Sequence, residues 1–177
     1  MSAGGESSPQ GIVSSFLHHD VYTGMEPTIR GYLDTDFPAV CGLERENSPK
    51  GCKPEVFIRQ AGVLFADTFL IAECGGEIAG YTIGAFVQHR QTTGWIVRLV
   101  VAERYRRRGL GESLVAAVIA GLRERGAYEV YLSVAPGNHA ARSLYARHGF
   151  LEMDFCPAYF GDGSDRCILR RGFVGKI

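Results

Sequence analysis

The sequence has no surplus charge of either sign and no long hydrophobic run. Nineteen Lys and Arg residues balance nineteen Asp and Glu residues, so the formal net charge is zero. A protein that binds nucleic acid through a broad basic surface is rarely balanced in this way, so we expect no nucleic-acid partner. No stretch of about 18 consecutive apolar residues occurs, which predicts no membrane span. The first 29 residues lack Lys and Arg, which argues against a secretory signal.

The cysteines are few and show no paired spacing. The chain has five, an odd number, and no two of them form a C-x-x-C motif. This usage favours free thiols in a reducing compartment over a disulfide framework or a zinc site. The consecutive residues His18, His19 and Asp20 could suggest a metal, but they fit a loose polar tail better. We therefore expect a cytoplasmic protein without a metal ion.

Length and composition indicate one globular domain that follows a tail. Hydrophobic residues make up 46% of the 177 positions, which is enough for the core of a single domain. Residues 1–26 begin with a run of small and polar side chains, and we expect a flexible N-terminal tail there. The domain is expected over residues 27–177.

The spacing of apolar residues predicts a mixed α/β fold. Helices are expected at 37–46, at 54–64, after Gly111 as far as Gly126, and at 139–148. Strands are expected at 28–30, 69–74, 77–87, 95–101, 130–134, 150–155 and 166–170. Antiparallel hairpins come first, and a strand–helix–strand–helix–strand order follows. This order predicts one sheet with helices on both faces, in which strands 95–101 and 130–134 run parallel.

An arginine- and glycine-rich turn connects strand 95–101 to the next helix. Its pattern is Arg106-x-x-Gly109-x-Gly111. Glycine lets the backbone come close to a ligand, and the first turn of a helix offers unpaired N–H groups to an anion such as pyrophosphate. The turn is neither a P-loop nor a G-x-G-x-x-G dinucleotide motif. By itself it fits an ordinary strand–turn–helix corner with surface arginines equally well.

A second pattern lies about 27 residues further on. It runs from Asn138 through Ala141, Leu144 and Tyr145 to Gly149-Phe150. Together the two segments resemble the GNAT superfamily of acetyl-CoA-dependent N-acetyltransferases, and the resemblance covers nearly all of the chain from about Thr28. It implies the GNAT fold, in which the strand before the arginine–glycine signature splays away from its parallel neighbour.

The resemblance also implies how acetyl-CoA would be held. The edge of the splayed strand, Leu99, Val100 and Val101, would pair with the pantetheine arm like an added strand. The signature begins at Arg106, and the pyrophosphate would lie on the backbone amides of Arg107, Arg108, Gly109, Leu110, Gly111 and Glu112. Asn138 would contact the cofactor further along, and its side chain suits a helix N-cap equally well.

Tyr145 occupies the position of the general acid in this superfamily. A phenol with a pKa near 10 stays protonated at neutral pH and can donate to the departing thiolate. The alternative is a tyrosine that only packs in the core. No cysteine lies in a motif that would support an acyl-enzyme, so direct attack by the amine in a ternary complex is expected.

The C-terminal part resembles the RimI-type ribosomal-protein alanine acetyltransferases and the archaeal protein N-terminal acetyltransferases. In these families a tyrosine-containing turn closes over the peptide N-terminus, and Tyr159 matches its first tyrosine. The RimI-type catalytic Glu is replaced by Ser133. Archaeal relatives instead use a Glu in an acidic-Asn-x-Pro loop, and Glu46-Asn47-Ser48-Pro49 matches that pattern. Glu46 is therefore the candidate base or the anchor of the substrate amine, or else a solvated residue at the end of a helix.

The resemblance predicts an acetyltransferase whose acceptor is a primary amine, most simply a protein N-terminus. Two alternatives stay open. The acceptor could be a small amine such as a polyamine, an amino acid or an aminoglycoside, or the protein could be a non-catalytic acyl-CoA-binding module. A monomer or a homodimer is expected.

Overall fold

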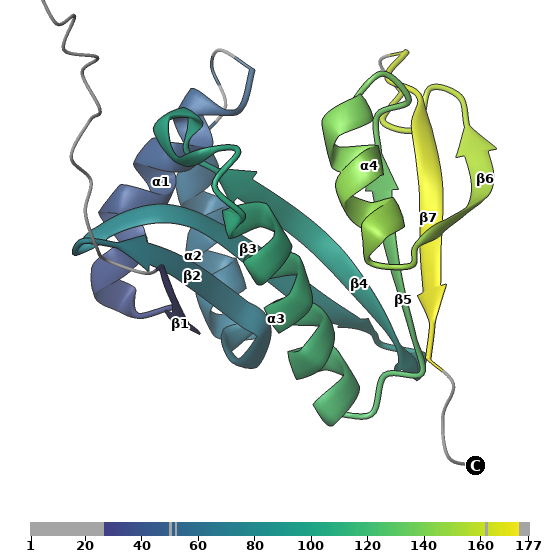
Figure 1. Cartoon of the computed structure of the whole chain (residues 1–177), viewed down its shortest axis with the longest axis horizontal. Coiled ribbons are helices and arrows are strands. Elements are labelled where there is room, and N and C mark those ends of the chain that lie inside the picture. Colours follow the sequence, from purple (N-terminus) through teal and green to yellow (C-terminus); the bar gives the residue numbers. More distant parts are fainter. Residues whose placement is uncertain (1–26, 50, 52, 162, 174–177) are drawn as a thin grey trace, which may run out of the picture.

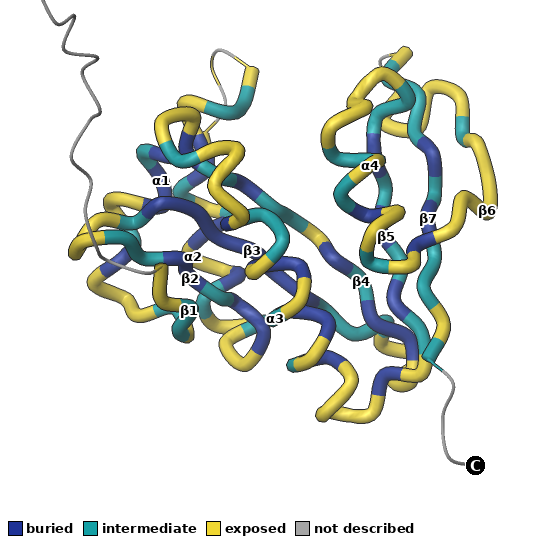
Figure 2. The backbone as a smooth tube through the Cα atoms, in the orientation of Figure 1, coloured by how far each residue is buried: buried dark blue, intermediate teal, exposed yellow. Residues whose placement is uncertain are grey.

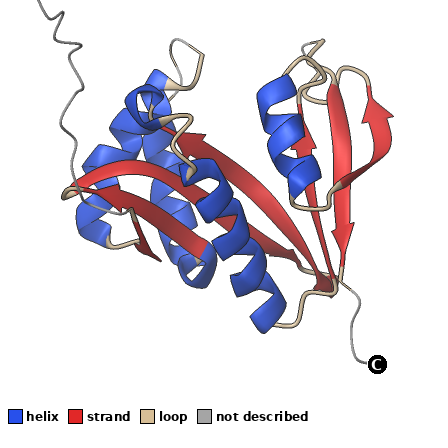
Figure 3. Ribbon diagram, in the orientation of Figure 1, coloured by secondary structure: helices blue, strands red, loops and turns tan. Residues whose placement is uncertain are grey.

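The computed structural model describes residues 27–49, 51, 53–161 and 163–173, which form a seven-stranded sheet with helices on both faces (Figures 1 and 3). The strand order is β1-β2-β3-β4-β5-β7-β6. The strands are β1 (Thr28–Gly31), β2 (Phe69–Cys74), β3 (Glu77–Val87), β4 (Arg90–Val101), β5 (Glu129–Val134), β6 (Leu151–Cys156) and β7 (Arg166–Gly172). The predicted α/β fold with a mixed sheet is confirmed. The predicted tail at 1–26 lies outside the described residues.

The first four strands pair antiparallel in chain order. β2 and β3 form a hairpin through Gly75 and Gly76, whose φ angles are 60° and 81°. A two-residue hairpin turn with both φ angles positive matches the twist of the strands, and glycine adopts it without strain. The core-facing positions of these strands, such as Phe69, Tyr81 and Ile83, are fully buried.

Two helix pairs cover opposite faces of the sheet. On one face α1 (Phe37–Glu46) and α2 (Pro54–Leu64) bury Val40 and Ile58 against β2 and β3. On the other face α3 (Leu110–Glu124) buries Leu114, Val115 and their neighbours. The shorter α4 (His139–Arg147) packs beside β5 and β7. Each large apolar side chain buried in this way contributes about 1.5–3 kcal/mol, and the buried stripes are visible in Figure 2.

The sheet divides between β4 and β5. These parallel strands pair only from Thr93 to Trp95 on β4, opposite Glu129 to Tyr131 on β5. Beyond this contact β4 carries a bulge at Val97, because Ile83 and Gly84 of β3 pair with Arg98 and Ile96. A bulge bends its strand, and Figure 1 shows β4 and β5 meeting at the bottom and diverging toward the top. The edge of β4 beyond Trp95 is therefore unpaired with β5.

Strand β4 is longer than the sequence predicts. It begins at Arg90 instead of Trp95, because the polar segment before Trp95 pairs with the end of β3 and then, at Thr93, with Glu129. The apolar pattern covers only the buried part of the strand. The extension depends on pairing partners that are distant in the sequence.

Candidate active site

A cleft of about 660 Å³ opens where β4 and β5 diverge. One wall is the free edge of β4, and the other walls come from the start of α3, the start of α4 and the residue after α1. The lining residues are Asn47, Arg98, Leu99, Val100, Val101, Tyr105, Arg106, Arg107, Gly109, Gly111, Glu112, Asn138, Ala140, Ala141, Leu144 and Arg147. The structure thus brings together most of the residues predicted to bind the cofactor.

Two predicted cofactor residues do not line this cleft with their side chains. Leu110 is 2% exposed and packs in the core beneath the first turn of α3. The guanidinium of Arg108 lies 5.7 Å from the centre of the Tyr105 ring. Only their backbone amides can serve the anion site that the sequence predicts.

Gly109 shapes the anion end of the cleft. It is the N-cap of α3 and has a φ of 82°, which β-branched and bulky residues adopt only with strain. A Cβ placed there meets no atom within 4 Å, because the residue faces open space. The unpaired N–H groups of the first turn of α3 follow it, so the backbone is suited to hold a phosphate.

Charged side chains around this end leave the cleft positive. Glu112 is paired with Arg147 at 2.6 Å and with His148 at 2.7 Å, which ties the start of α3 to the end of α4. The pairing with Arg147, aided by His148, lowers the pKa of Glu112 despite its partial burial. Arg147 neutralises this carboxylate, and Arg106 and Arg107 add positive charge. The sequence analysis missed Arg147, which follows Tyr145 by two positions.

Arg106 bridges the cleft instead of pointing along α3. Its Nε donates to the carbonyl oxygen of Val101 at 3.1 Å, and its Nη2 donates to Oδ1 of Asn47 at 2.6 Å. Asn47 is fixed in turn, because its Nδ2 donates to the carbonyl of Leu43 at 2.8 Å. The predicted acidic-Asn-x-Pro loop therefore reaches the cleft through Asn47.

A buried polar network lies beneath β4. Glu44 is 6% exposed and accepts hydrogen bonds from Nε of Arg98 at 3.0 Å, from Nη2 of Arg98 at 2.6 Å, from Ser48 at 2.6 Å and from the hydroxyl of Tyr81. Burial and the Glu44 carboxylate raise the pKa of Tyr81. Burial alone would lower the pKa of Arg98, but Glu44 more than compensates and raises it. Sequence reasoning missed this network, because nothing local shows that residues 44, 81 and 98 meet.

Tyr145 lies on α4 with its ring packed in the core. It is 7% exposed, and its ring meets Phe150 edge-on at 5.7 Å between centroids. Burial raises the pKa of Tyr145 to about 12, and the positive charge of Arg98 acts in the opposite direction. The phenol therefore keeps its proton at neutral pH, as a proton donor requires.

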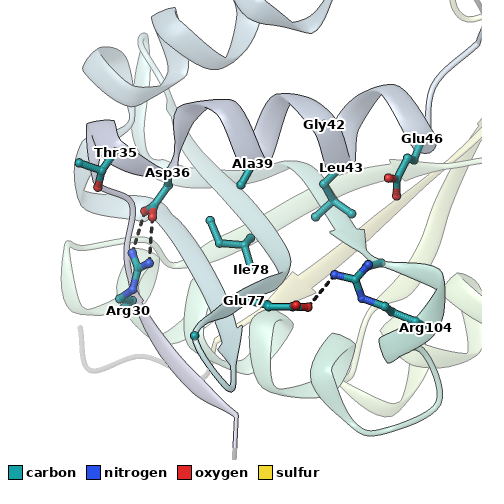
Figure 4. Close-up of a pocket in the computed structure, with 12 residues that line it drawn as sticks. Arg30, Thr35, Asp36, Ala39, Gly42, Leu43, Glu46, Glu77, Ile78 and Arg104 are labelled. Carbon is teal, nitrogen blue, oxygen red and sulfur yellow. Dashed lines mark hydrogen bonds and ion pairs between the residues drawn. The ribbon is translucent and has the colours of Figure 1, made fainter.

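The structure does not bring Glu46 to Tyr145. The side chain of Glu46 is exposed and lines a different pocket of about 450 Å³, shared with Arg30, Asp36 and Arg104 (Figure 4). Glu44 points into the core, and Glu46, two positions later on α1, points elsewhere. Helical geometry places residues two apart on different sides.

Of the predicted site residues, Tyr145, Tyr159 and Ser133 lie outside the residues that line the cleft. Tyr159 is on the turn between β6 and β7, is 42% exposed and meets Phe160 edge-on at 5.0 Å. Its backbone N–H donates to the carbonyl of Ser164 at 3.0 Å. Ser133 is on β5 and pairs with Ile168 of β7.

The part of the chain that the structure describes contains no helix long and apolar enough to span a membrane.

The splayed sheet and the positive cleft beside a helix N-terminus define an enzyme of the acyl-CoA-dependent N-acyltransferase class. A model of the acetyltransferase (GNAT) family matches residues 33–150, and the chain belongs to this family. An N-alpha-acetyltransferase of Sulfurisphaera tokodaii is 31% identical over 156 residues, covering 82% of this chain and 93% of that protein.

Solved structures agree with this assignment. Ard1 from Thermoplasma volcanium is similar with a TM-score of 0.76 and 25% identity, over 84% of this chain and 99% of that chain. The ribosomal-protein-S18-alanine N-acetyltransferase from Escherichia coli is similar with a TM-score of 0.71 and 25% identity, over 85% of this chain and 97% of that chain. The resemblance stated from the sequence is confirmed.

Proposed function

We propose that this acetyltransferase transfers an acetyl group from acetyl-CoA to the α-amine of a protein or peptide N-terminus. The observation that carries the proposal is the cleft of about 660 Å³, which combines the free edge of β4, the N-terminus of α3 and the guanidinium of Arg98. The names of the similar proteins support the choice of acceptor. We further propose a cytoplasmic monomer or homodimer, and no metal ion enters the proposal.

The residues of the cleft fit the cofactor. The backbone of Leu99, Val100 and Val101 offers a strand edge for the pantetheine arm. The amides from Arg107 to Glu112 and the guanidiniums of Arg106, Arg107 and Arg147 suit the phosphates. Asn138 caps α4, since its side chain accepts from the N–H of Ala141 at 3.1 Å, and it also faces the cleft. When bound, acetyl-CoA supplies the thioester that the acceptor amine attacks.

Tyr145 supplies a proton at the reacting end. Transfer of the proton from a phenol of pKa about 12 to a thiolate whose thiol has a pKa of about 8.5 is uphill by about 5 kcal/mol. Tyr145 therefore acts first as a hydrogen-bond donor to the departing sulfur. The charge of Arg98 opposes the effect of burial on the pKa and brings the proton closer to transfer.

The acceptor needs little help to lose its own proton. An α-amine has a pKa of about 8, whereas a lysine ε-amine has a pKa of about 10.4, so much more of the α-amine is neutral at physiological pH. An N-terminal acceptor therefore suits a site in which Ser133 replaces the RimI-type Glu. Glu46 as the base stays a prediction, and its place in another pocket gives it no support. Tyr159 is proposed to contact the acceptor from the β6–β7 turn.

The excess of arginine in the cleft disfavours a polyamine. Of the charged residues that line it, Arg98, Arg106, Arg107 and Arg147 are cationic and only Glu112 is anionic. A polycation would be repelled, whereas nucleotide phosphates are attracted.

The test is an assay of thiol release. The protein is incubated with acetyl-CoA and either peptides that begin with Ala, Ser or Met or the polyamine spermidine. We expect CoA release with peptides only, and mass spectrometry should locate the acetyl group on the α-amine. Release of CoA with spermidine alone would show that the acceptor is a small amine and not a protein N-terminus. Binding of acetyl-CoA without any release would favour the non-catalytic module.

A further inference from the structure

The guanidinium of Arg98 is fixed on one side and open on the other. Nε and Nη2 donate to Glu44, and Nη2 also approaches Oγ of Ser48 at 3.3 Å. Nη1 donates to none of the residues that the structure describes. The side chain is 34% exposed where it lines the cleft. The edge of the guanidinium that carries Nε and Nη2 is thus held rigidly, and Nη1 is available to a ligand.

Arg98 lines the part of the cleft beside the free edge of β4, which the proposed function assigns to the reacting groups. Arg98 precedes the free strand edge formed by Leu99, Val100 and Val101, and its charge acts on the hydroxyl of Tyr145. The phosphate end of the cleft is built separately, by the first turn of α3. An acceptor that approaches Tyr145 therefore meets Arg98.

No described carboxylate is left to compensate Arg98 on its open side. Glu44 has both oxygens engaged, each by two donors, on the buried side. Asn47, the other lining residue from this region, is neutral. A guanidinium N–H prefers a carboxylate, and a hydrogen bond to an ionised acceptor is about twice as strong as a neutral one. A nearby cation is repelled.

We propose that Arg98 selects the acceptor, and that its Nη1 binds a carboxylate on the side chain of the first or second residue of the peptide. Acidic N-termini are then preferred over neutral ones, and basic ones are disfavoured. This inference rests on the proposed function. Glu44 acts through Arg98, because it holds the guanidinium in place.

The test compares matched peptides that differ in one side chain. Asp and Asn, which have nearly the same shape, are placed at position one or at position two, and kcat/KM is measured for each. The Asp/Asn ratio is expected to reach about tenfold at one of these positions. Because the ratio is internal to one enzyme preparation, partial unfolding of a variant lowers both values and leaves the ratio unchanged.

Variants then assign the preference. In Arg98→Gln the ratio should fall to about one, and in the double variant Glu44→Gln/Arg98→Gln, which removes both charges together, it should stay there. Arg98→Lys should keep part of it. Arg125→Gln is the matched control, because it removes an arginine paired with Asp67 outside the cleft.

The outcomes separate this inference from the proposed function. A wild-type ratio of one, or a ratio that survives in Arg98→Gln, overturns the role of Arg98 while peptide acetylation stands. If no peptide releases thiol, the proposed function fails, and the inference fails with it.

Discussion

Replacing Tyr145 by phenylalanine separates its chemical role from its packing role. The hydroxyl of Tyr145 donates no hydrogen bond to any described residue, whereas the ring packs against Phe150. Tyr145→Phe keeps the ring and removes only the oxygen. The free energy of unfolding should therefore change by less than about 0.5 kcal/mol. For a chain of this size such a change shifts the melting temperature by about 2 °C or less.

Turnover should respond very differently. Loss of a positioned proton donor typically costs about 10²- to 10⁴-fold. The lower bound corresponds to about 2.7 kcal/mol of transition-state stabilisation. The affinity for acetyl-CoA should stay constant, because the cleft residues proposed to hold the phosphates are unchanged.

Three measurements decide the outcome: kcat from thiol release, the dissociation constant of acetyl-CoA by calorimetry, and the melting temperature. Tyr128→Phe is the matched control, since Tyr128 is 59% exposed and lies between α3 and β5. A kcat within threefold of wild type, or a parallel loss of kcat, affinity and stability, would refute the acid role.

The pH profile gives an independent check on Tyr145. Its pKa of about 12 means that the phenol is almost fully protonated below about pH 11. Ionisation of Tyr145 removes the proton donor only as the pH rises through that value. The wild-type kcat should therefore show no falling limb assignable to this group below about pH 11. A falling limb near pH 9 that disappears in Tyr145→Phe would contradict the buried environment.

Gly109→Val should abolish acetyl-CoA binding measured by calorimetry, whereas Gly126→Val, which places the same side chain at a φ of 99° at the far end of α3, should bind normally. Equal affinity for acetyl-CoA in the two variants would show that the phosphates bind elsewhere. Glu44→Ala should destabilise the fold by about 1–3 kcal/mol in denaturant unfolding, because it leaves the partly exposed guanidinium of Arg98 and the buried hydroxyl of Tyr81 without their carboxylate partner; a cost well below about 1 kcal/mol would mean that the network contributes little. If Glu46 is the base, Glu46→Gln should lower the rate most at low pH, where the amine most needs deprotonation, and an unchanged pH–rate profile would exclude Glu46 as the base.

The variant Glu44→Ala has a structural control of its own. Replacing the whole network, as Glu44→Leu with Arg98→Met and Tyr81→Phe, removes both charges and the buried hydroxyl together. Apolar replacements of similar volume are often neutral or stabilising in such cases. Most of the stability should therefore return in the triple variant, as measured by the same unfolding curves.

The sequence determined most of the elements and predicted the residues proposed to hold the cofactor, because both depend on local patterns. Alternating or helical spacing of apolar residues marks a strand or a helix, and the glycine pattern places Gly109 correctly at the start of α3, where the anion site is proposed. The predicted start of β4 was wrong, because the strand begins at Arg90 through pairing with partners that are distant in the sequence.

Only the tertiary structure decided how Arg98 is held at the cleft. Whether Glu44 or Glu46 faces the sheet depends on how α1 rotates when it packs, and spacing alone does not give that angle. The meeting of Glu44, Tyr81 and Arg98 joins a helix to two strands, across separations of 37 and 54 residues. A contact of this kind forms only after the chain has folded, because it needs the bulge in β4 and the packing of α1 at the same time.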